Sequence, residues 1–202
     1  MEPAVKSYEQ WWQNNVANGK YYTIDQFRTI LGNIDSRKAY LDIVKGGDRV
    51  LDVGCGLGLD YEFYRKNNID IDYTGIDVCT GFIEDCRKTY PQGRFEVYPS
   101  YETPYGDKEF NVATARHLLE HLKEPYSTLS EMCRVAEQVA IIWFIHPGVE
   151  EKIHLSRKGF YKNKYSCKLL KEYIHSIGAT LKVVDIQSRS SKKSHQLWHL
   201  KC

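Results

Sequence analysis

The sequence predicts an α/β protein with a doubly wound, mostly parallel seven-stranded sheet that is preceded by N-terminal helices. Three observations support this fold class. Short apolar runs alternate with helical segments from residue 49 onward, a glycine-rich turn directly follows the first run, and 202 residues suffice for one domain with a buried core. We expect one domain in two parts, an N-terminal helical segment over residues 1–46 that packs on an α/β core over residues 47–202.

The N-terminal part is helical and aromatic in character. Asp25 is suited to cap one helix, and Asp35 or Ser36 to cap another that ends at Gly46 and Gly47. Strands and helices then alternate, which favours a parallel sheet covered on both faces. The expected strands are 49–53, 71–77, 94–98, 110–115, 139–145, 181–186 and 196–200, and the expected helices are 59–67, 80–90, 127–135 and 166–177.

Charge is spread unevenly over a formal net charge of +2. Residues 1–100 hold 12 Lys and Arg against 15 Asp and Glu, whereas the segment from Glu150 onward holds 12 against 4. This basic last quarter either attracts an acidic substrate or is simply a solvated lysine-rich face, and the second reading is favoured.

Composition also bears on location and redox state. No run approaches the roughly 18 to 20 apolar residues that span a bilayer, and the first residues lack the apolar core of a signal peptide. The six cysteines form no Cys-x-x-Cys pair. We therefore expect a cytoplasmic protein whose cysteines are all reduced thiols.

The turn after the first predicted strand carries the strongest functional signal. Gly54, Gly56 and Gly58 stand at alternate positions between a strand and a helix, where glycine permits a sharp turn and close approach of a ligand. The dinucleotide fingerprint requires a glycine where Leu59 stands, and the Gly-Lys-Ser/Thr of a phosphate-binding loop is absent. Both nucleotide-binding motifs are thus excluded.

The segment Val50-Leu51-Asp52-Val53-Gly54-Cys55-Gly56-Leu57-Gly58 instead resembles motif I of class I S-adenosylmethionine-dependent methyltransferases. Asp77 at the end of the second strand, Glu109-Phe110-Asn111-Val112 and His117-Leu118-Leu119-Glu120-His121-Leu122 extend the resemblance, which covers about residues 49–145. The chain is most similar to the small single-domain, type 11-like branch. The resemblance implies a Rossmann-like methyltransferase fold with S-adenosyl-L-methionine as cofactor, S-adenosyl-L-homocysteine as product and no metal.

The resemblance also implies roles for individual residues. The methionine portion of the cofactor would lie on the glycine turn, the ribose hydroxyls on Asp77, and the adenine against Val78. The implied cofactor-binding residues are Asp52 (toward the methionine amino group), Gly54, Cys55, Gly56, Gly58, Asp77, Val78, Ser100, Tyr101 and Arg116. Two positions depart from the family, since Pro99 and Asn111 stand where many relatives carry Asp. The alternative for Asp52 and Asp77 is simple capping of the next turn or helix.

The methyl group on a sulfonium is already activated, so positioning dominates catalysis and a base is needed only for a protonated acceptor. His117 and His146 are the candidate bases because each follows a central strand, whereas His121 is interpreted as a packed residue. The resemblance also implies that the N-terminal segment, residues 1–46, forms a lid over the cofactor. The candidate cleft residues of this lid, which are alternatively ordinary packing residues, are Tyr8, Trp11, Trp12, Tyr21 and Tyr22.

The sequence therefore predicts methyl transfer to an acceptor that it does not identify, with a small molecule, sugar or lipid favoured. One alternative is an RNA-directed enzyme, to which the basic residues Lys162, Lys164, Arg189, Lys192 and Lys193 would contribute. The other is a non-catalytic protein that binds S-adenosylmethionine. Aminopropyl transfer is disfavoured because no acidic polyamine-binding segment is found. The oligomeric state is left open.

Overall fold

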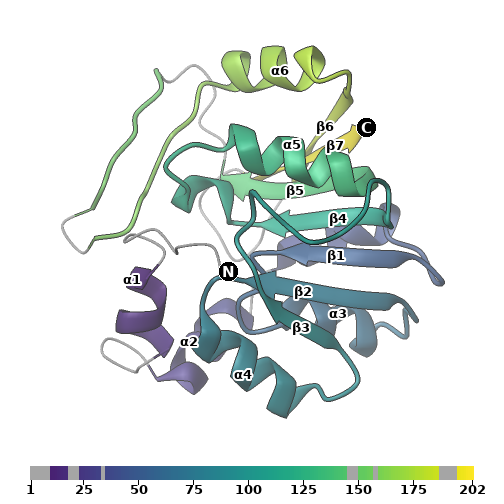
Figure 1. The fold of residues 1–202 in the computed structure, drawn as a ribbon, viewed down its shortest axis with the longest axis vertical. Coiled ribbons are helices and arrows are strands. Elements are labelled where there is room, and N and C mark those ends of the chain that lie inside the picture. Colours follow the sequence, from purple (N-terminus) through teal and green to yellow (C-terminus); the bar gives the residue numbers. More distant parts are fainter. Residues whose placement is uncertain (1–9, 18–22, 33–34, 145–149, 157–158, 187–194) are drawn as a thin grey trace.

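The computed structural model describes residues 10–17, 23–32, 35–144, 150–156, 159–186 and 195–202. A seven-stranded sheet forms its centre, in the order β3-β2-β1-β4-β5-β7-β6 (Figure 1). The strands are β1 Arg49–Val53, β2 Asp72–Asp77, β3 Arg94–Val97, β4 Phe110–Arg116, β5 Ala136–Phe144, β6 Thr180–Ile186 and β7 His195–Lys201. All neighbours pair in parallel except β7, which is antiparallel to β5 and β6.

Helices connect these strands. They are α1 Gln10–Trp12, α2 Ile24–Gly32, α3 Leu59–Lys66, α4 Thr80–Thr89, α5 Tyr126–Val135 and α6 Cys167–Ser176. A π-helical turn η1 (Gln13–Ala17) and the 3-10 helices η2 (Asp35–Asp42) and η3 (Leu119–His121) complete the set. The predicted fold class is confirmed, and the predicted core elements are present with shifts of one to three residues at their ends.

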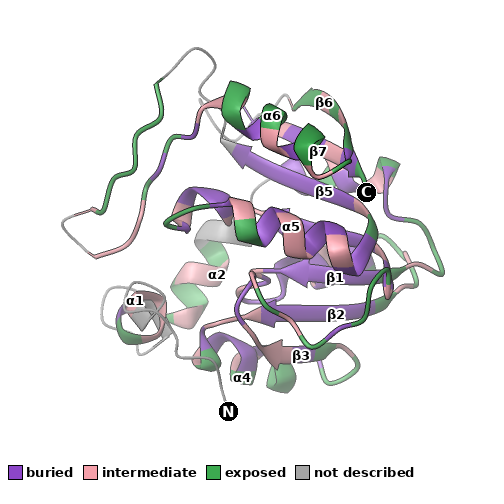
Figure 2. Cartoon of the chain, turned by 45° about the horizontal axis from the view of Figure 1, so that its top comes forward, coloured by how far each residue is buried: buried purple, intermediate pink, exposed green. Residues whose placement is uncertain are grey.

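Alternation along the strands produces two hydrophobic cores, one on each face of the sheet. Leu51, Val53 and Ala113 belong to the core that α5 and α6 cover. Their neighbours Val50 and Val112 belong to the other core, which η2, α3 and α4 cover. Because both faces are covered, the central strands are buried almost throughout, as Figure 2 shows.

The N-terminal helices differ in one respect from the expectation. The segment that Asp35 or Ser36 was expected to open as a helix ending at Gly46 is a 3-10 helix that ends at Asp42. In α6, by contrast, Ser166 caps the helix as expected, since its side chain accepts a hydrogen bond from the Leu169 amide.

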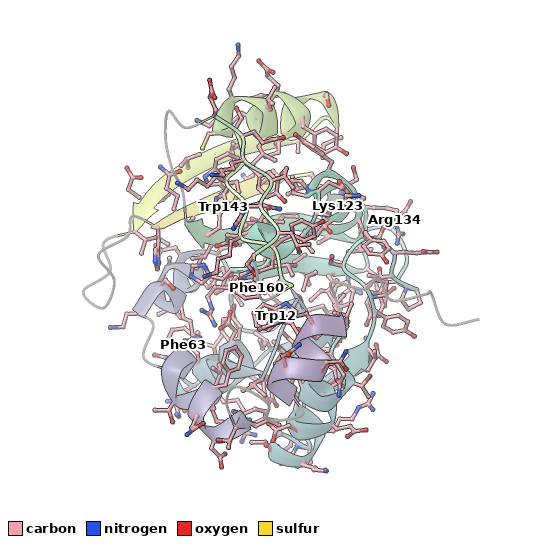
Figure 3. All side chains as sticks on the ribbon, turned by 90° about the vertical axis from the view of Figure 1, so that its left-hand side faces the viewer. Trp12, Phe63, Lys123, Arg134, Trp143 and Phe160 are labelled. Atoms are coloured by element: carbon pink, nitrogen blue, oxygen red, sulfur yellow. A yellow bond between two sulfur atoms is a disulfide. The ribbon has the colours of Figure 1, made fainter. Side chains whose placement is uncertain are left out.

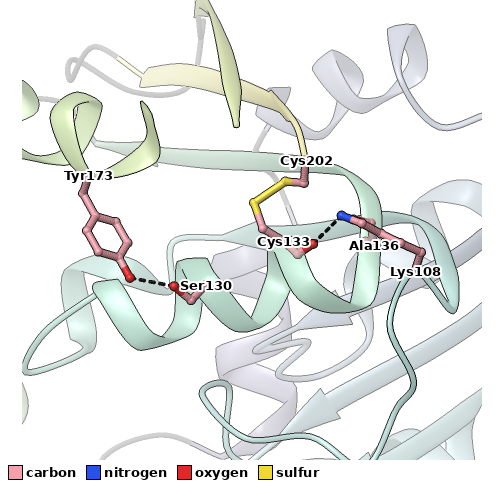
Figure 4. Close-up of a disulfide and its surroundings, with 6 residues drawn as sticks. All are labelled: Lys108, Ser130, Cys133, Ala136, Tyr173 and Cys202. Carbon is pink, nitrogen blue, oxygen red and sulfur yellow. Dashed lines mark hydrogen bonds between the residues drawn. A yellow bond between two sulfur atoms is a disulfide. The ribbon is translucent and has the colours of Figure 1, made fainter. Parts of the chain in front are cut away.

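The prediction that all six cysteines are reduced is wrong for two of them. Cys133 near the end of α5 and Cys202 after β7 form a disulfide, with their Cα atoms 5.3 Å apart (Figure 4). The other four described cysteines are free thiols. Pairing across 69 positions depends on how α5 packs against β7, which no local motif reveals. Cysteine usage therefore no longer supports a reducing compartment.

Within the described ranges, every helix is too short or too polar to cross a bilayer.

Candidate functional site

The sheet reverses its winding between β1 and β4, and the glycine turn lies at the carboxyl end of β1. Three amides fix this turn to the end of β2. The N–H groups of Gly54 and Cys55 donate to the Ile76 carbonyl oxygen at 2.8 and 3.0 Å, and the Gly56 N–H donates to Oδ2 of Asp77 at 3.0 Å. The turn and Asp77 are thus one hydrogen-bonded unit at the position where such sheets bind ligands.

The three glycines of the turn serve different purposes. Gly54 has a φ of +72°, and a Cβ there would lie 2.9 Å from the Leu118 side chain. Gly58 is buried, and a Cβ there would press on the Tyr90 ring at 3.1 Å. A Cβ on Gly56 would meet nothing within 4 Å, so open space lies above this residue. Gly56 therefore leaves room for a ligand, whereas Gly58 serves packing.

A pocket of about 380 Å³ opens beside the turn. It lies at the carboxyl ends of β1, β2, β3 and β4 and receives side chains from the N-terminal helices. Its lining comprises Trp12, Phe27, Gly54, Cys55, Gly56, Leu57, Leu59, Asp77, Val78, Phe82, Tyr98, Ser100, Arg116, His117, Leu118, His121 and Leu122. Seven of the ten predicted cofactor-binding residues are thus brought together.

The other three predicted cofactor-binding residues lie outside this lining. They are Asp52, Gly58 and Tyr101, of which Asp52 and Gly58 are buried and Tyr101 is half-buried. Of the two predicted bases, His117 lines the pocket and His146 lies outside the described residues.

Asp77 provides a carboxylate at one edge of the pocket. Besides the Gly56 amide, its carboxylate accepts a hydrogen bond from the Cys79 amide at 2.8 Å, just before α4. A carboxylate has about four acceptor positions, so two amides are compatible with further donors such as a diol. The capping alternative and the ligand-binding prediction for Asp77 are therefore compatible with each other.

Arg116 brings a positive charge to the opposite side of the pocket. Its Nε donates to both oxygens of Asp60 at 3.0 and 3.2 Å, and Asp60 also pairs with Nε of Arg37 at 2.5 Å. Asp60 is buried, which raises its pKa, but the charges of Arg116 and Arg37 outweigh burial and lower the pKa overall. The ionised Asp60 therefore fixes the Arg116 guanidinium in place.

Only Nε of Arg116 takes part in those bonds, and its two terminal nitrogens form no hydrogen bond with the described residues. Two parallel N–H donors on one guanidinium match the geometry of a carboxylate. Arg116 is thus suited to hold a carboxylate at the pocket.

Asp52 lies in the interior, with 2% of its surface exposed. Tyr73 donates its hydroxyl to Oδ2 at 2.6 Å, and Thr114 donates its hydroxyl to Oδ1 at 3.2 Å. Burial and then the charge of Asp60 raise the pKa of Asp52 to about 7, although the bonds from Tyr73 and Thr114 lower it. Asp52 thus links β1, β2 and β4 beneath the turn and lies outside the pocket lining.

His117 is held by Glu120. Its Nδ1 lies 2.9 Å from Oε1 of Glu120, its Nε2 is buried, and its ring packs edge-on against His195 with centroids 5.1 Å apart. Burial raises the pKa of Glu120, but the hydrogen bond from His117 and the charges of His117 and His121 lower it overall. The environment of His117 thus resembles that of a packed residue.

His121, rather than His117, has a ring nitrogen that is suited to accept a proton. Its Nδ1 lies 2.8 Å from the carbonyl oxygen of Tyr161, and because a carbonyl only accepts, Nδ1 carries the proton. Nε2 of the neutral ring is then the acceptor nitrogen, on a residue that lines the pocket. The sequence could not reveal this, since Tyr161 is 40 positions away.

Aromatic side chains form the outer wall of the pocket. Trp12 lies beside Phe160 (Figure 3), with 5.7 Å between ring centroids. Trp12 also packs edge-on against His121 at 5.2 Å and lies 6.3 Å from Phe27 between ring centroids. Trp12 is one of the predicted cleft residues, whereas Phe27 and Phe160 were missed because aromatic residues are equally common in cores. Of the other predicted cleft residues, Trp11 contacts Phe160, and Tyr8, Tyr21 and Tyr22 lie outside the described residues.

The remaining lining matches an adenine in character. Val78 and Phe82 follow β2, and Tyr98 and Ser100 follow β3. Ser100 is bonded to the Thr128 hydroxyl at 2.8 Å, which fixes the loop after β3. Within the described ranges, no group of three or more His, Cys, Asp or Glu side chains is arranged to hold a metal ion.

Comparison with known proteins agrees with this geometry. Residues 51–144 match a family model described as a methyltransferase domain. Phosphoethanolamine N-methyltransferase 3 of Arabidopsis thaliana is 32% identical over 99 residues, which cover 46% of this chain and 20% of that protein. Demethylmenaquinone methyltransferase of Renibacterium salmoninarum is 29% identical over 104 residues, 50% of this chain and 43% of that protein. The chain thus spans less than half the length of these relatives.

Solved structures share the fold. Phosphoethanolamine N-methyltransferase 2 of Haemonchus contortus, in complex with S-adenosyl-L-methionine, superposes with a TM-score of 0.71 at 14% identity, over 98% of this chain and 60% of that one. The family model matched over residues 51–144, the sheet topology and the glycine turn hydrogen-bonded to Asp77 together support a class I S-adenosylmethionine-dependent methyltransferase.

Proposed function

We propose that this protein transfers a methyl group from S-adenosyl-L-methionine to a small acceptor that carries a hydroxyl on an apolar ring. One observation carries the cofactor assignment: a carboxylate that can accept a diol (Asp77) and a guanidinium that can hold a carboxylate (Arg116) line the same pocket, on either side of the glycine turn. The adenosyl and amino acid ends of S-adenosylmethionine carry these two groups. Few other metabolites combine them.

The residues of this chain would each have a defined task. Asp77 binds the ribose hydroxyls, Arg116 the carboxylate, and Gly56 leaves the space in which the ligand passes over the turn. When bound, S-adenosylmethionine supplies a methyl group on a sulfonium, which needs alignment with the acceptor rather than further activation. Seven lining residues thus bear on cofactor binding. Asp52, Gly58 and Tyr101 lie outside the lining and would support the turn and its loops.

His121 is our proposed base. Tyr161 fixes the tautomer, so Nε2 can accept a proton from an acceptor hydroxyl while Trp12 and Phe160 keep the ring in position. His117 is better suited to position the start of η3, because Glu120 holds Nδ1 and Nε2 is buried.

The acceptor class rests on the lining. Beyond the residues assigned to the cofactor, the described wall includes Trp12, Phe27, His121 and Leu122, together with His117 and three further leucines, Leu57, Leu59 and Leu118. Apolar side chains predominate, which suits a flat apolar ring. Among the described lining residues, Arg116 is the sole permanent cation, and in our proposal it binds the carboxylate of the cofactor. An acceptor bearing a phosphate is therefore disfavoured, although two of the relatives are named for phosphoethanolamine.

Calorimetry with S-adenosyl-L-homocysteine tests the cofactor assignment. We expect the wild type to bind, and Asp77→Ala to lose about 100-fold or more in affinity, because two charge-assisted hydrogen bonds are worth about 1.5–3 kcal/mol each. Asp107→Ala, an exposed acid that pairs with Arg134, is the matched control. Equal affinity of Asp77→Ala and wild type would remove Asp77 from the site.

Turnover is tested separately, by release of S-adenosylhomocysteine in the presence of catechols and naphthohydroquinones. Binding without release for any acceptor would favour the non-catalytic alternative.

A further inference from the structure

Between β5 and α6, the described residues 150–156 and 159–165 form a two-stranded hairpin that projects beside the N-terminal helices (Figure 1). Lys152 pairs with Lys164, and Leu155 pairs with Tyr161, both in antiparallel register. We call residues 150–156 and 159–165 the hairpin. Its outer strand, residues 150–155, is exposed at every position, whereas Asn163 and Tyr165 of the inner strand are buried (Figure 2).

The hairpin is firmly attached to the wall of the pocket. The Asn163 amide donates to the Glu120 carbonyl oxygen at 2.8 Å, and the Tyr165 hydroxyl donates to the Leu122 carbonyl oxygen at 2.6 Å. The Tyr161 carbonyl oxygen accepts a hydrogen bond from Nδ1 of His121, and Phe160 packs on Trp12. Anything that binds the hairpin therefore lies next to the pocket.

One face of the hairpin is basic. Successive residues of a strand point to opposite faces, so Lys162 and Lys164 share the face away from buried Asn163. Lys152 lies opposite Lys164, and His154 lies opposite Lys162, whose amide donates to the His154 carbonyl oxygen at 2.9 Å. Like charges directly opposite each other destabilise a strand pair, so this face favours an anionic surface that would relieve the repulsion. Among the described residues of this basic face, the acidic residue is Glu150, at the start of the outer strand.

The outer strand is also apolar. Ile153 is 46% exposed and Leu155 is 53% exposed, the highest values among the large hydrophobic residues of the described chain. They alternate with Lys152 and His154 along a strand whose two faces are both open to solvent. Exposed aliphatic side chains next to lysines are typical of segments that lie in the interface of an anionic bilayer.

RNA is the other polyanion that a basic hairpin could bind. Recognition of single-stranded RNA relies on exposed aromatic rings and arginine for base stacking. In the described hairpin the exposed apolar residues are aliphatic, and Phe160 is packed against Trp11 and Trp12. The side chains thus favour a lipid surface over RNA.

We propose that the outer strand of the hairpin docks the protein on an anionic lipid bilayer and so places the mouth of the pocket where apolar acceptors partition. Lysines of the basic face would lie among the lipid headgroups, and Ile153 and Leu155 would enter the boundary between headgroups and acyl chains. Docking is independent of the proposed methyl transfer, although it would supply that reaction with acceptors dissolved in the bilayer.

Cosedimentation of the full chain with vesicles tests this proposal. We expect binding to vesicles of phosphatidylcholine mixed with phosphatidylglycerol, and much weaker binding to pure phosphatidylcholine. Lys152→Gln/Lys162→Gln/Lys164→Gln should lower partitioning roughly 100-fold at low salt, because each lysine near an anionic surface contributes appreciably. Ile153→Ser/Leu155→Ser, which keeps every charge, should lower it roughly tenfold.

Matched controls carry the same changes elsewhere. Lys45→Gln/Lys66→Gln/Lys88→Gln removes three exposed lysines remote from the hairpin, and Val184→Ser removes an aliphatic side chain that is 39% exposed on β6. Calorimetry with S-adenosylhomocysteine on every variant shows whether the protein is folded with an intact cofactor site. This readout is separate from vesicle binding, so a failure of docking and a failure of the proposed function are distinguishable.

Three outcomes would overturn the proposal. They are equal binding of the wild type to neutral and anionic vesicles, an equal loss in the control lysine variant, and an absence of vesicle binding together with tight binding of single-stranded RNA that depends on Lys152, Lys162 and Lys164.

Discussion

The two sides of the pocket are built in different ways. On the cofactor side, Asp77 and Arg116 sit at the carboxyl ends of β2 and β4 and are fixed by hydrogen bonds, such as the one from the Gly56 amide to Asp77. On the acceptor side, Trp12, His121 and Phe160 come from three separate segments and contact one another through their rings. A shared fold therefore specifies the first side, whereas local additions to the fold specify the second.

This difference predicts that mutations on the two sides affect different steps. His121→Asn should lower kcat by about 100- to 10,000-fold with a hydroxyl acceptor, because a general base contributes that much, and leave S-adenosylhomocysteine affinity unchanged. Stopped assays of product release measure the first quantity and calorimetry the second. His154→Asn, on the exposed hairpin, is the control, and partial rescue of His121→Asn by added imidazole would support proton transfer. A kcat within a few-fold of the wild type would eliminate His121 as the base.

The same comparison explains what the sequence could predict. The strands, the glycine turn and Asp77 follow from local patterns, because apolar alternation and glycine spacing act over a few residues. The positions of Asp60 and Arg37 beside Arg116 were missed, since a charged residue on a helix is usually solvated.

The acceptor side could not be predicted, because Trp12 and Phe160 meet only after the sheet has brought distant segments together. The Cys133–Cys202 disulfide was missed for the same reason. The sequence favours His121 as a packed residue, and the contact that supports our proposal of a base joins it to the Tyr161 carbonyl, 40 positions away.

On the cofactor side, the assignment of Arg116 can be sharpened with two ligands. S-adenosylhomocysteine carries the carboxylate, whereas 5′-methylthioadenosine lacks it. Arg116→Gln should weaken the first about tenfold to 100-fold, since hydrogen bonds to a charged group are worth about 1.5–3 kcal/mol, and leave the second unchanged. Asp60→Asn should show the same selectivity if Asp60 positions Arg116. A parallel loss for both ligands would indicate collapse of the pocket and remove the carboxylate role.

Asp52 lies below the turn, and substituting it tests whether it contacts the cofactor or only supports the turn. Its pKa is about 7 in the folded protein, against about 3.9 in an unfolded chain, so the folded state holds the proton more tightly. The stability that Asp52 contributes is therefore greatest at acid pH and is lost as the pH rises from about 4 through about 7. Asp52→Asn cannot ionise, so its stability relative to the wild type should rise by on the order of 2 kcal/mol between about pH 5 and about pH 8.

Denaturant unfolding of both proteins across that range measures the effect, and the difference between them cancels the other titrating groups. A constant difference would mean that Asp52 is ionised throughout, as a group in contact with solvent or ligand would be. Binding of S-adenosylhomocysteine and of 5′-methylthioadenosine then distinguishes two hypotheses for the role of Asp52. If Asp52 held the methionine amino group, Asp52→Asn would weaken S-adenosylhomocysteine but not 5′-methylthioadenosine. If it supports β1, β2 and β4 from below through Tyr73 and Thr114, both affinities should change together or not at all.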